Sequence, residues 1–170
     1  AWAAPAGVPW AGASLARQAG RRLAASPGVP RGAGVPIRKE IPVAAGMAGG
    51  SADAAAALVA CDALWGTGLG RPELAILAAR VGSDVPFALM GGTALGTGRG
   101  ERLTPAMVGG VFHWVLAMSD QGLAAPAVYA KLDELRSNRT ILAPGVAPDV
   151  LAALRAADAP ALGRLLGNDL

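Results

Sequence analysis

The stretch IPVAAGMAGGSADAAAAL, residues 41–58, decides the predicted fold of this chain. It ends a segment in which Val35, Ile37 and Ile41 alternate with polar or small residues, which predicts a strand over residues 35–43. A turn with three glycines follows, and the alanine-rich run after Ser51 predicts a helix over residues 52–65. A strand, a glycine turn and a helix therefore follow one another.

This order of elements suits the binding of phosphate. Gly46, Gly49 and Gly50 leave the backbone open to a ligand. The first amides of a helix lack acceptors within it, and the helix dipole adds partial positive charge there. The stretch has neither the lysine of a Walker A loop nor a GxGxxG pattern. On glycine content alone, a plain strand–turn–helix corner with Ser51 as N-cap explains the pattern equally well.

The rest of the chain mixes helices with strands and indicates an α+β protein. Helices are predicted over residues 14–25, 71–81, 126–135, 149–156 and 159–166. Strands are predicted over residues 85–89 and 111–118, both as buried apolar runs. The glycine-rich residues 91–100 connect the two halves, and we place the domain boundary so that residues 1–108 and 109–170 form separate domains.

Asp84 is the second candidate functional residue. It follows Gly82 and Ser83 and precedes the apolar run, where a carboxylate is costly to bury without partners or a task. Beside a bound phosphate it could orient a substrate hydroxyl and accept its proton. An aspartate that caps its own turn explains the residue as well.

Composition excludes several classes of protein. Hydrophobic residues make up 53% and charged residues 16%, so disorder is not expected. The net charge of +3 is scattered, which argues against nucleic-acid binding. Cys61 is the single cysteine, so no internal disulfide or structural zinc site is expected. Without a signal peptide or a long apolar run, the sequence predicts a cytoplasmic protein without a membrane partner.

Three other polar residues have ordinary explanations. His113 lies in the apolar run of residues 111–118 and is expected to be a core histidine, not a catalytic one. Asp53 is explained as a first-turn or capping acid. Arg99 and Arg102 could neutralise phosphate, although solvated arginines are commoner.

Three motifs together resemble the GHMP kinase family. They are PVAAGMAGGSADAAA at residues 42–56, GSDVPFAL at residues 82–89 and GGTALGTGRGE at residues 91–101. Lys39, before Ile41 and Pro42, matches a further K-x-I-P pattern. The resemblance covers nearly the whole chain. The second and third motifs are most similar to the branch that phosphorylates 4-diphosphocytidyl-2-C-methyl-D-erythritol.

The resemblance implies an ATP-dependent, Mg²⁺-requiring transfer to the 2-hydroxyl of that substrate, in non-mevalonate isoprenoid (terpenoid) biosynthesis. Asp84 would be the catalytic acid residue, and Ser51 would help to place Mg²⁺. The residues expected to bind ATP are Pro42, Val43, Ala44, Ala45, Gly46, Met47, Ala48, Gly49, Gly50, Ser51 and Ala52. The implied fold is a partial domain like ribosomal protein S5 domain 2, followed by the start of a ferredoxin-like domain.

The chain also departs from the family pattern. The family's first strands and their catalytic lysine have no counterpart, because the only lysines are Lys39 and Lys131. A late SGSGP-like motif is missing, and Ala124 and Ala125 stand where the family often has a hydroxyl. We therefore expect an internal fragment that is weakly active or inactive alone. The alternatives are another GHMP kinase, of homoserine or mevalonate type, and a catalytically dead nucleotide-binding module. The sequence does not indicate an oligomeric state.

Overall fold

The computed structural model describes residues 14–26, 28–29, 32–38, 40–41, 46–117, 123–138, 140–141, 145 and 147–168. These residues divide into two compact units. The first comprises the described parts of Ala1–Val43, Met47–Gly92 and Gly96–Leu103. The second comprises those of Ala44–Gly46, Thr93–Leu95 and Thr104–Leu170.

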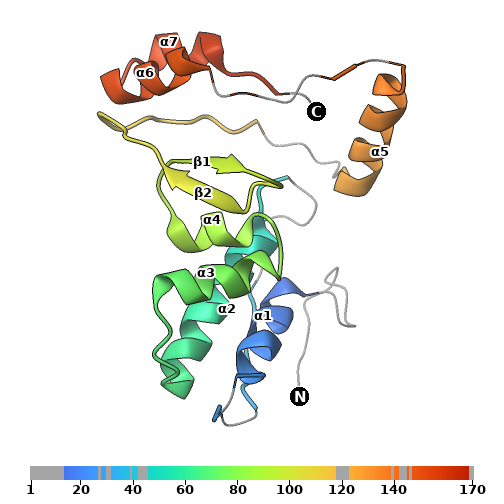
Figure 1. The fold of residues 1–170 in the computed structure, drawn as a ribbon, viewed down its shortest axis with the longest axis vertical. Coiled ribbons are helices and arrows are strands. Elements are labelled where there is room, and N and C mark those ends of the chain that lie inside the picture. The colour runs from blue at the N-terminus through green and yellow to red at the C-terminus, as the bar shows by residue number, and fades with distance from the viewer. Residues whose placement is uncertain are drawn as a thin grey trace. The chain divides into compact units, whose positions relative to one another are not determined.

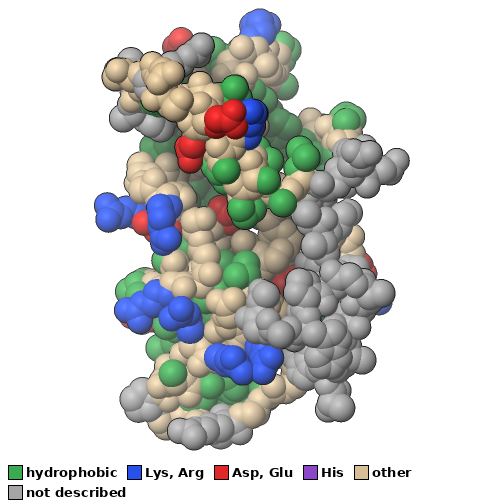
Figure 2. Space-filling model, turned by 90° about the vertical axis from the view of Figure 1, so that its right-hand side faces the viewer, with side chains coloured by type: hydrophobic (Ala, Val, Ile, Leu, Met, Phe, Trp, Pro, Cys, Tyr) green, Lys and Arg blue, Asp and Glu red, His purple; other side chains and the backbone are tan. Residues whose placement is uncertain are grey.

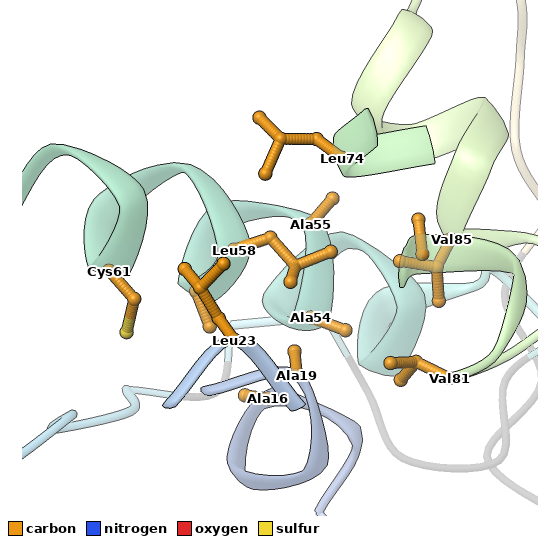
Figure 3. Packing of buried hydrophobic residues seen from close by; sticks show 12 residues of the cluster. Ala16, Ala19, Leu23, Ala54, Ala55, Leu58, Cys61, Leu74, Val81 and Val85 are labelled. Atoms are coloured by element: carbon orange, nitrogen blue, oxygen red, sulfur yellow. The ribbon is translucent and has the colours of Figure 1, made fainter. Parts of the chain in front are cut away.

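Four helices build the first unit (Figure 1). They are α1 (Leu15–Ala24), α2 (Gly49–Trp65), α3 (Arg71–Ala79) and α4 (Val85–Met90). Helix α2 packs against each of the other three. Figure 3 shows this core, with side chains of α1 on one side of α2 and Leu74 of α3 on the other. The buried apolar residues of this cluster are Ala16, Ala19, Leu23, Ala54, Ala55, Ala57, Leu58, Cys61, Leu74, Ala78, Val81 and Val85.

Helix α1 confirms the prediction from its apolar spacing. Ala16, Ala19 and Leu23 are buried on one face, while Arg17 and Arg21 are exposed. Two basic residues in its last turn also complement the negative end of the helix dipole. An amphipathic pattern of this kind is stabilised by burial of one face against a neighbouring helix, here α2.

Helix α2 begins at Gly49, three residues before the predicted start, and ends where predicted. Gly66 is its C-cap with φ 60°, a left-handed conformation that glycine adopts without steric cost. Just beyond, the Asp62 carboxylate accepts hydrogen bonds from the Thr67 hydroxyl and from the Leu69 amide, the latter at 3.2 Å. The side chain of Asp62 thus fixes the loop that turns the chain into α3.

The strand predicted over residues 85–89 is wrong, because this run forms helix α4. Pro86 stands in the first turn of the helix, where its missing N–H costs nothing. Val85 and Pro86 are buried while Phe87 is exposed. A six-residue apolar run does not distinguish a short buried helix from a strand by periodicity.

The strand predicted over residues 35–43 is also not present in its described part. Residues 35–38, 40 and 41 form no strand, and residues 42 and 43 lie outside the described residues. Val35 and Ile37 are partly buried against the core cluster, so the alternation correctly indicated which side chains turn inward. A strand also needs a neighbour for its backbone groups, and no described residue pairs with this segment.

Strands β1 (Ala94–Thr97) and β2 (Arg102–Pro105) form a hairpin within the glycine-rich connection. The Ala106 amide donates to the Thr93 carbonyl at 2.9 Å and closes the open end of the hairpin. At the tip, Gly98 and Gly100 have φ values of +72° and +100°. These positions favour glycine, so the glycines here make a tight turn.

The second unit contains the helices α5 (Ala125–Arg136), α6 (Pro148–Ala156) and α7 (Ala159–Leu165), close to their predicted bounds. Helices α6 and α7 pack together and bury Ala153 and Leu162. The Gly109 amide donates to the Leu154 carbonyl at 3.0 Å, which ties the chain after the hairpin to the end of α6.

The buried strand predicted over residues 111–118 is wrong for residues 111–117, and Met118 lies outside the described residues. Val111, Trp114 and Val115 are 81%, 65% and 98% exposed, and His113 is exposed rather than a core residue. Apolar residues form a buried strand only where another layer covers them, and no described residue does so here. The ferredoxin-like start stays a prediction.

On the face shown in Figure 2, Lys and Arg side chains form separate groups, with apolar and neutral side chains between them. Within the described residues, no helix is both long enough and apolar enough to cross a lipid bilayer.

Candidate active site

The start of α2 is built from backbone in left-handed conformations. Ala48 is the N-cap with φ 49° and ψ 25°, and Gly46 has φ +68°. A left-handed alanine costs roughly 1–2 kcal/mol, and such strain often accompanies ligand-binding loops. The plain corner with Ser51 as N-cap is contradicted, because the helix begins before Ser51 and no side chain caps it.

Two backbone amides at this helix start are without an acceptor among the described residues. The amides of Ser51 and Ala52 both donate to the Ala48 carbonyl, at 2.9 and 3.0 Å. Those of Gly49 and Gly50 make no such bond to a described residue. Amides of this kind, at the positive end of a 17-residue helix, are suited to binding an anion such as phosphate.

Ser51 and Asp53 lie just inside α2. Ser51 is its third residue and is only 8% exposed, which makes it the one buried polar residue in the described core. Asp53 is half-buried and lies beyond the first turn, so the explanation as a capping or first-turn acid is wrong. Ser51 lies inside the helix and Asp53 beyond its first turn because α2 begins at Gly49, before the predicted start at residue 52.

Asp84 occupies the N-cap position of α4. Its backbone carbonyl accepts from the Ala88 amide at 3.1 Å, but its carboxylate makes no capping hydrogen bond. The side chain is exposed, and its Oδ1 accepts from the Ser83 hydroxyl at 3.5 Å. The capping explanation is therefore contradicted, and the carboxylate is open to a substrate.

The glycine loop and the acid turn approach the same side chain. A β-carbon built on Gly50 would lie 3.6 Å from Cδ1 of Leu15, and one built on Gly82 would lie 3.9 Å from the same atom. Figure 3 shows Val81 and Val85, on either side of the acid turn, beside the part of α2 that carries Ala54. The structure thus brings together the two segments that the sequence singled out.

Sequence reasoning missed Leu15 as a neighbour of this site and did not predict the left-handed backbone of Ala48. Neither leaves a signal in the sequence, because Leu15 reads as an ordinary core position of α1 and alanine rarely adopts a positive φ. Their roles follow from tertiary contacts and from backbone dihedral angles.

Several predicted positions lie outside the described residues. Among the expected ATP-binding residues, this holds for Pro42, Val43, Ala44 and Ala45. Lys39 is outside as well. Lys131, in α5, pairs with Glu134 at 2.8 Å on an exposed surface. Ala124 and Ala125 are exposed at the start of α5.

Three charged residues at the tip of the hairpin, Arg99, Glu101 and Arg102, interact with one another. The Arg99 amide donates to Oε2 of Glu101 at 2.7 Å, and the side chains of Arg99 and Arg102 lie 3.9 and 4.0 Å from its carboxylate. Hydrogen bonds from its own backbone amide and from that of Arg99 lower the pKa of Glu101, and the two arginines add to this effect. Arg99 and Arg102 are therefore both exposed to solvent and paired with Glu101 of the same turn.

No three acidic, histidine or cysteine side chains come together as metal ligands within the described ranges. Mg²⁺ in phosphate-transfer sites usually keeps several waters and takes one or two protein ligands besides the phosphates, so this arrangement is compatible with it.

Comparisons with known proteins identify the fold. Residues 13–92 match the family of GHMP kinases N terminal domain. The chain is 55% identical over 169 residues to a 4-diphosphocytidyl-2-C-methyl-D-erythritol kinase of Leifsonia xyli subsp. xyli, covering 96% of this chain and 55% of that protein. It is 57% identical over 159 residues to the enzyme of the same name from Salinispora arenicola, with coverage of 92% and 50%.

A solved kinase structure is also similar to the chain. The crystal structure of a 4-(cytidine 5'-diphospho)-2C-methyl-D-erythritol kinase superposes with a TM-score of 0.60 at 30% identity, over 88% of this chain and 53% of that one. The chain thus spans about half the length of the curated relatives it matches. Residues 13–92 thus belong to the family of GHMP kinase N-terminal domains.

Proposed function

We propose that the protein carrying this chain transfers the γ-phosphoryl group of ATP to the 2-hydroxyl of 4-diphosphocytidyl-2-C-methyl-D-erythritol, a step of non-mevalonate isoprenoid biosynthesis. One observation carries the proposal: Gly50 of the glycine loop and Gly82 of the turn that precedes the exposed Asp84 both lie near the Leu15 Cδ1 methyl group. The two relatives at 55% and 57% identity are named as kinases of this substrate, which supports the choice of substrate.

The glycine loop would bind the phosphates of ATP. The open amides of Gly49 and Gly50, the left-handed turn at Ala48 and the positive helix end all suit a polyanion. The remaining loop residues, 42–47, 51 and 52, would complete the nucleotide site. Backbone donors held in this way need no reorganisation as charge moves during transfer.

Asp84 would act on the substrate hydroxyl. Its carboxylate would orient the 2-hydroxyl and accept its proton while the hydroxyl oxygen bonds to the γ-phosphorus and the bond to the β-phosphate oxygen breaks. ADP then carries away the released charge. The exposed side chain, with only the 3.5 Å contact to the Ser83 hydroxyl, leaves carboxylate lone pairs for this task.

Bound Mg²⁺ would neutralise charge on the phosphates during transfer. Ser51 is the proposed protein ligand, because it follows the two open amides directly on α2. We also propose that residues 1–108 and 109–170 belong to different domains. The expectation of a cytoplasmic protein stays a prediction.

The test is a substrate panel with the full-length gene product, ATP and Mg²⁺, in which mass spectrometry follows each acceptor and its phosphorylated product. We expect turnover with 4-diphosphocytidyl-2-C-methyl-D-erythritol and none with homoserine or mevalonate. Turnover with either of the latter alone would replace the substrate. Nucleotide binding without turnover of any acceptor would leave the nucleotide-binding module as the function.

A further inference from the structure

Leu15 contacts both halves of the candidate active site. It is the first residue of α1 and is partly buried against the core cluster. Its Cδ1 lies 3.6 Å from a β-carbon built on Gly50 and 3.9 Å from one built on Gly82. A methyl group added at either glycine would therefore make an ordinary van der Waals contact with Leu15, so Cδ1 of Leu15 lies near both backbones.

Gly50 of the phosphate loop and Gly82 of the Asp84 turn are the residues at which the two segments lie near Leu15. Gly50 carries one of the open amides of the loop, and the Gly82 carbonyl accepts from the Val85 amide at 3.3 Å in the turn that presents Asp84. Neither glycine has a side chain that could keep the segments apart. Apart from its chain neighbours and the backbone of its own helix, the only described atom within 4 Å of the Gly50 β-carbon position is Leu15 Cδ1. At the Gly82 position, Cγ2 of Val85 is nearer, at 3.4 Å.

We propose that Leu15 is a positioning residue, whose Cδ1 methyl group sets the spacing between the phosphate loop and the Asp84 turn. The inference rests on the proposed function, because it gives that spacing a catalytic purpose. Phosphoryl transfer depends on the alignment of the attacking oxygen with the γ-phosphorus, and a misplacement of about 1 Å can cost roughly 100-fold in rate.

The chain offers a matched control on the same helix. Leu23 is completely buried in the same cluster, whereas Leu15 is only partly buried. Truncation of Leu23 to alanine should therefore cost more stability than truncation of Leu15. Leu23 is not within 4 Å of the β-carbon position of Gly50, so it should not affect the spacing.

The first experiment compares Leu15→Ala, Leu15→Met and Leu23→Ala in the full-length gene product, at a temperature where circular dichroism shows all of them folded. Leu15→Ala should lower kcat about 10- to 100-fold, with the KM for ATP changed less than about 3-fold. Leu15→Met should restore most of the rate, because methionine keeps the volume. Leu23→Ala should lower Tm the most and change kcat less than about 3-fold.

The second experiment does not use activity. Gly50→Ala and Gly82→Ala are combined in a double-mutant cycle, with Leu15 and with Leu15→Ala as backgrounds, and Tm is measured. Both added methyl groups would contact Leu15 Cδ1, so their Tm shifts should fail to add with Leu15 present and should add once it is alanine.

The outcomes separate this inference from the function on which it rests. An unchanged kcat in Leu15→Ala, an equal loss in Leu23→Ala, or additive Tm shifts in both backgrounds would overturn the positioning role. No turnover by the wild-type protein would overturn the proposed function and the catalytic purpose of Leu15, while the cycle would still decide whether Leu15 couples the two segments.

Discussion

A β-carbon added to Gly20 would lie 3.6 Å from Sγ of Cys61, so α1 and α2 meet closely at the thiol. Cys61 is 2% exposed, and burial raises the pKa of its thiol. Figure 3 shows the side chain on the side of α2 that carries the contacts to α1. The neutral thiol thus behaves here as a small apolar side chain.

The raised pKa of Cys61 predicts a loss of stability at alkaline pH. The unfolded chain loses the thiol proton at the ordinary thiol pKa, while the folded protein retains it to higher pH. The unfolded state therefore binds fewer protons in this window, and the free energy of unfolding falls as pH rises. Urea unfolding from pH 7 to 10, under reducing conditions, should show wild type losing more stability than Cys61→Ala. Parallel curves would mean that the thiol does not contribute.

Asp84→Asn should abolish most turnover and spare the binding of ATP. The amide keeps the shape of the side chain but cannot accept the hydroxyl proton, so kcat should fall at least about 100-fold. The phosphates contact the loop instead, so the Kd for ATP, measured by calorimetry, should stay within about 3-fold. Glu73→Gln, at an exposed acid in the first turn of α3, is the matched control and should leave both values unchanged. Persistent turnover in Asp84→Asn would remove Asp84 from the mechanism.

Gly49→Val should weaken the binding of ATP. Gly49 is buried at the first position of α2, and a branched side chain there would occlude its amide. We expect the Kd for ATP to rise at least about tenfold, or roughly 1.4 kcal/mol. Gly163→Val introduces the same side chain at a helical glycine with no atom within 4 Å and should leave affinity unchanged. Equal affinities for both variants would contradict the loop assignment.

Ser51→Ala should raise the Mg²⁺ concentration required for half-maximal activity. Removal of the hydroxyl would take one oxygen ligand from the ion without disturbing the Ser51 amide, which already donates to the Ala48 carbonyl. A titration of activity with Mg²⁺ at saturating ATP measures the effect. Ser83→Ala, which removes the hydroxyl beside Asp84, is the control and should leave the Mg²⁺ midpoint in place. An unshifted midpoint in Ser51→Ala would exclude Ser51 as a ligand.

The sequence predicted those parts of the fold that depend on local patterns. The spacing of Leu15, Ala19 and Leu23 located α1, and Gly66 located the end of α2, because a helix face and a left-handed cap are both visible in a single chain. The glycine loop and Asp84 were proposed as site residues from residue type and order, and the structure places Gly50 and Gly82 of their segments near one methyl group of Leu15.

The parts that failed depend on distant neighbours. Val85 begins a helix and Val115 is 98% exposed, yet both lie in short apolar runs that are typical of buried strands. Which structure such a run adopts depends on what covers it, and no local pattern records that. The left-handed backbone conformation of Ala48 could not be predicted from the sequence either, because alanine disfavours a positive φ.

Gly109→Ala should loosen the second unit at the end of α6. A β-carbon at Gly109 would overlap the carbonyl oxygen of Arg155, while the Gly109 amide donates to the Leu154 carbonyl at 3.0 Å. Because the obstacle is backbone, the chain must move away and give up this hydrogen bond. Hydrogen exchange should then be faster in α6 and α7, whereas Gly145→Ala, with no described atom within 4 Å of the added methyl, should leave it unchanged. Equal protection in both variants would show that the contact between residue 109 and α6 does not hold these helices.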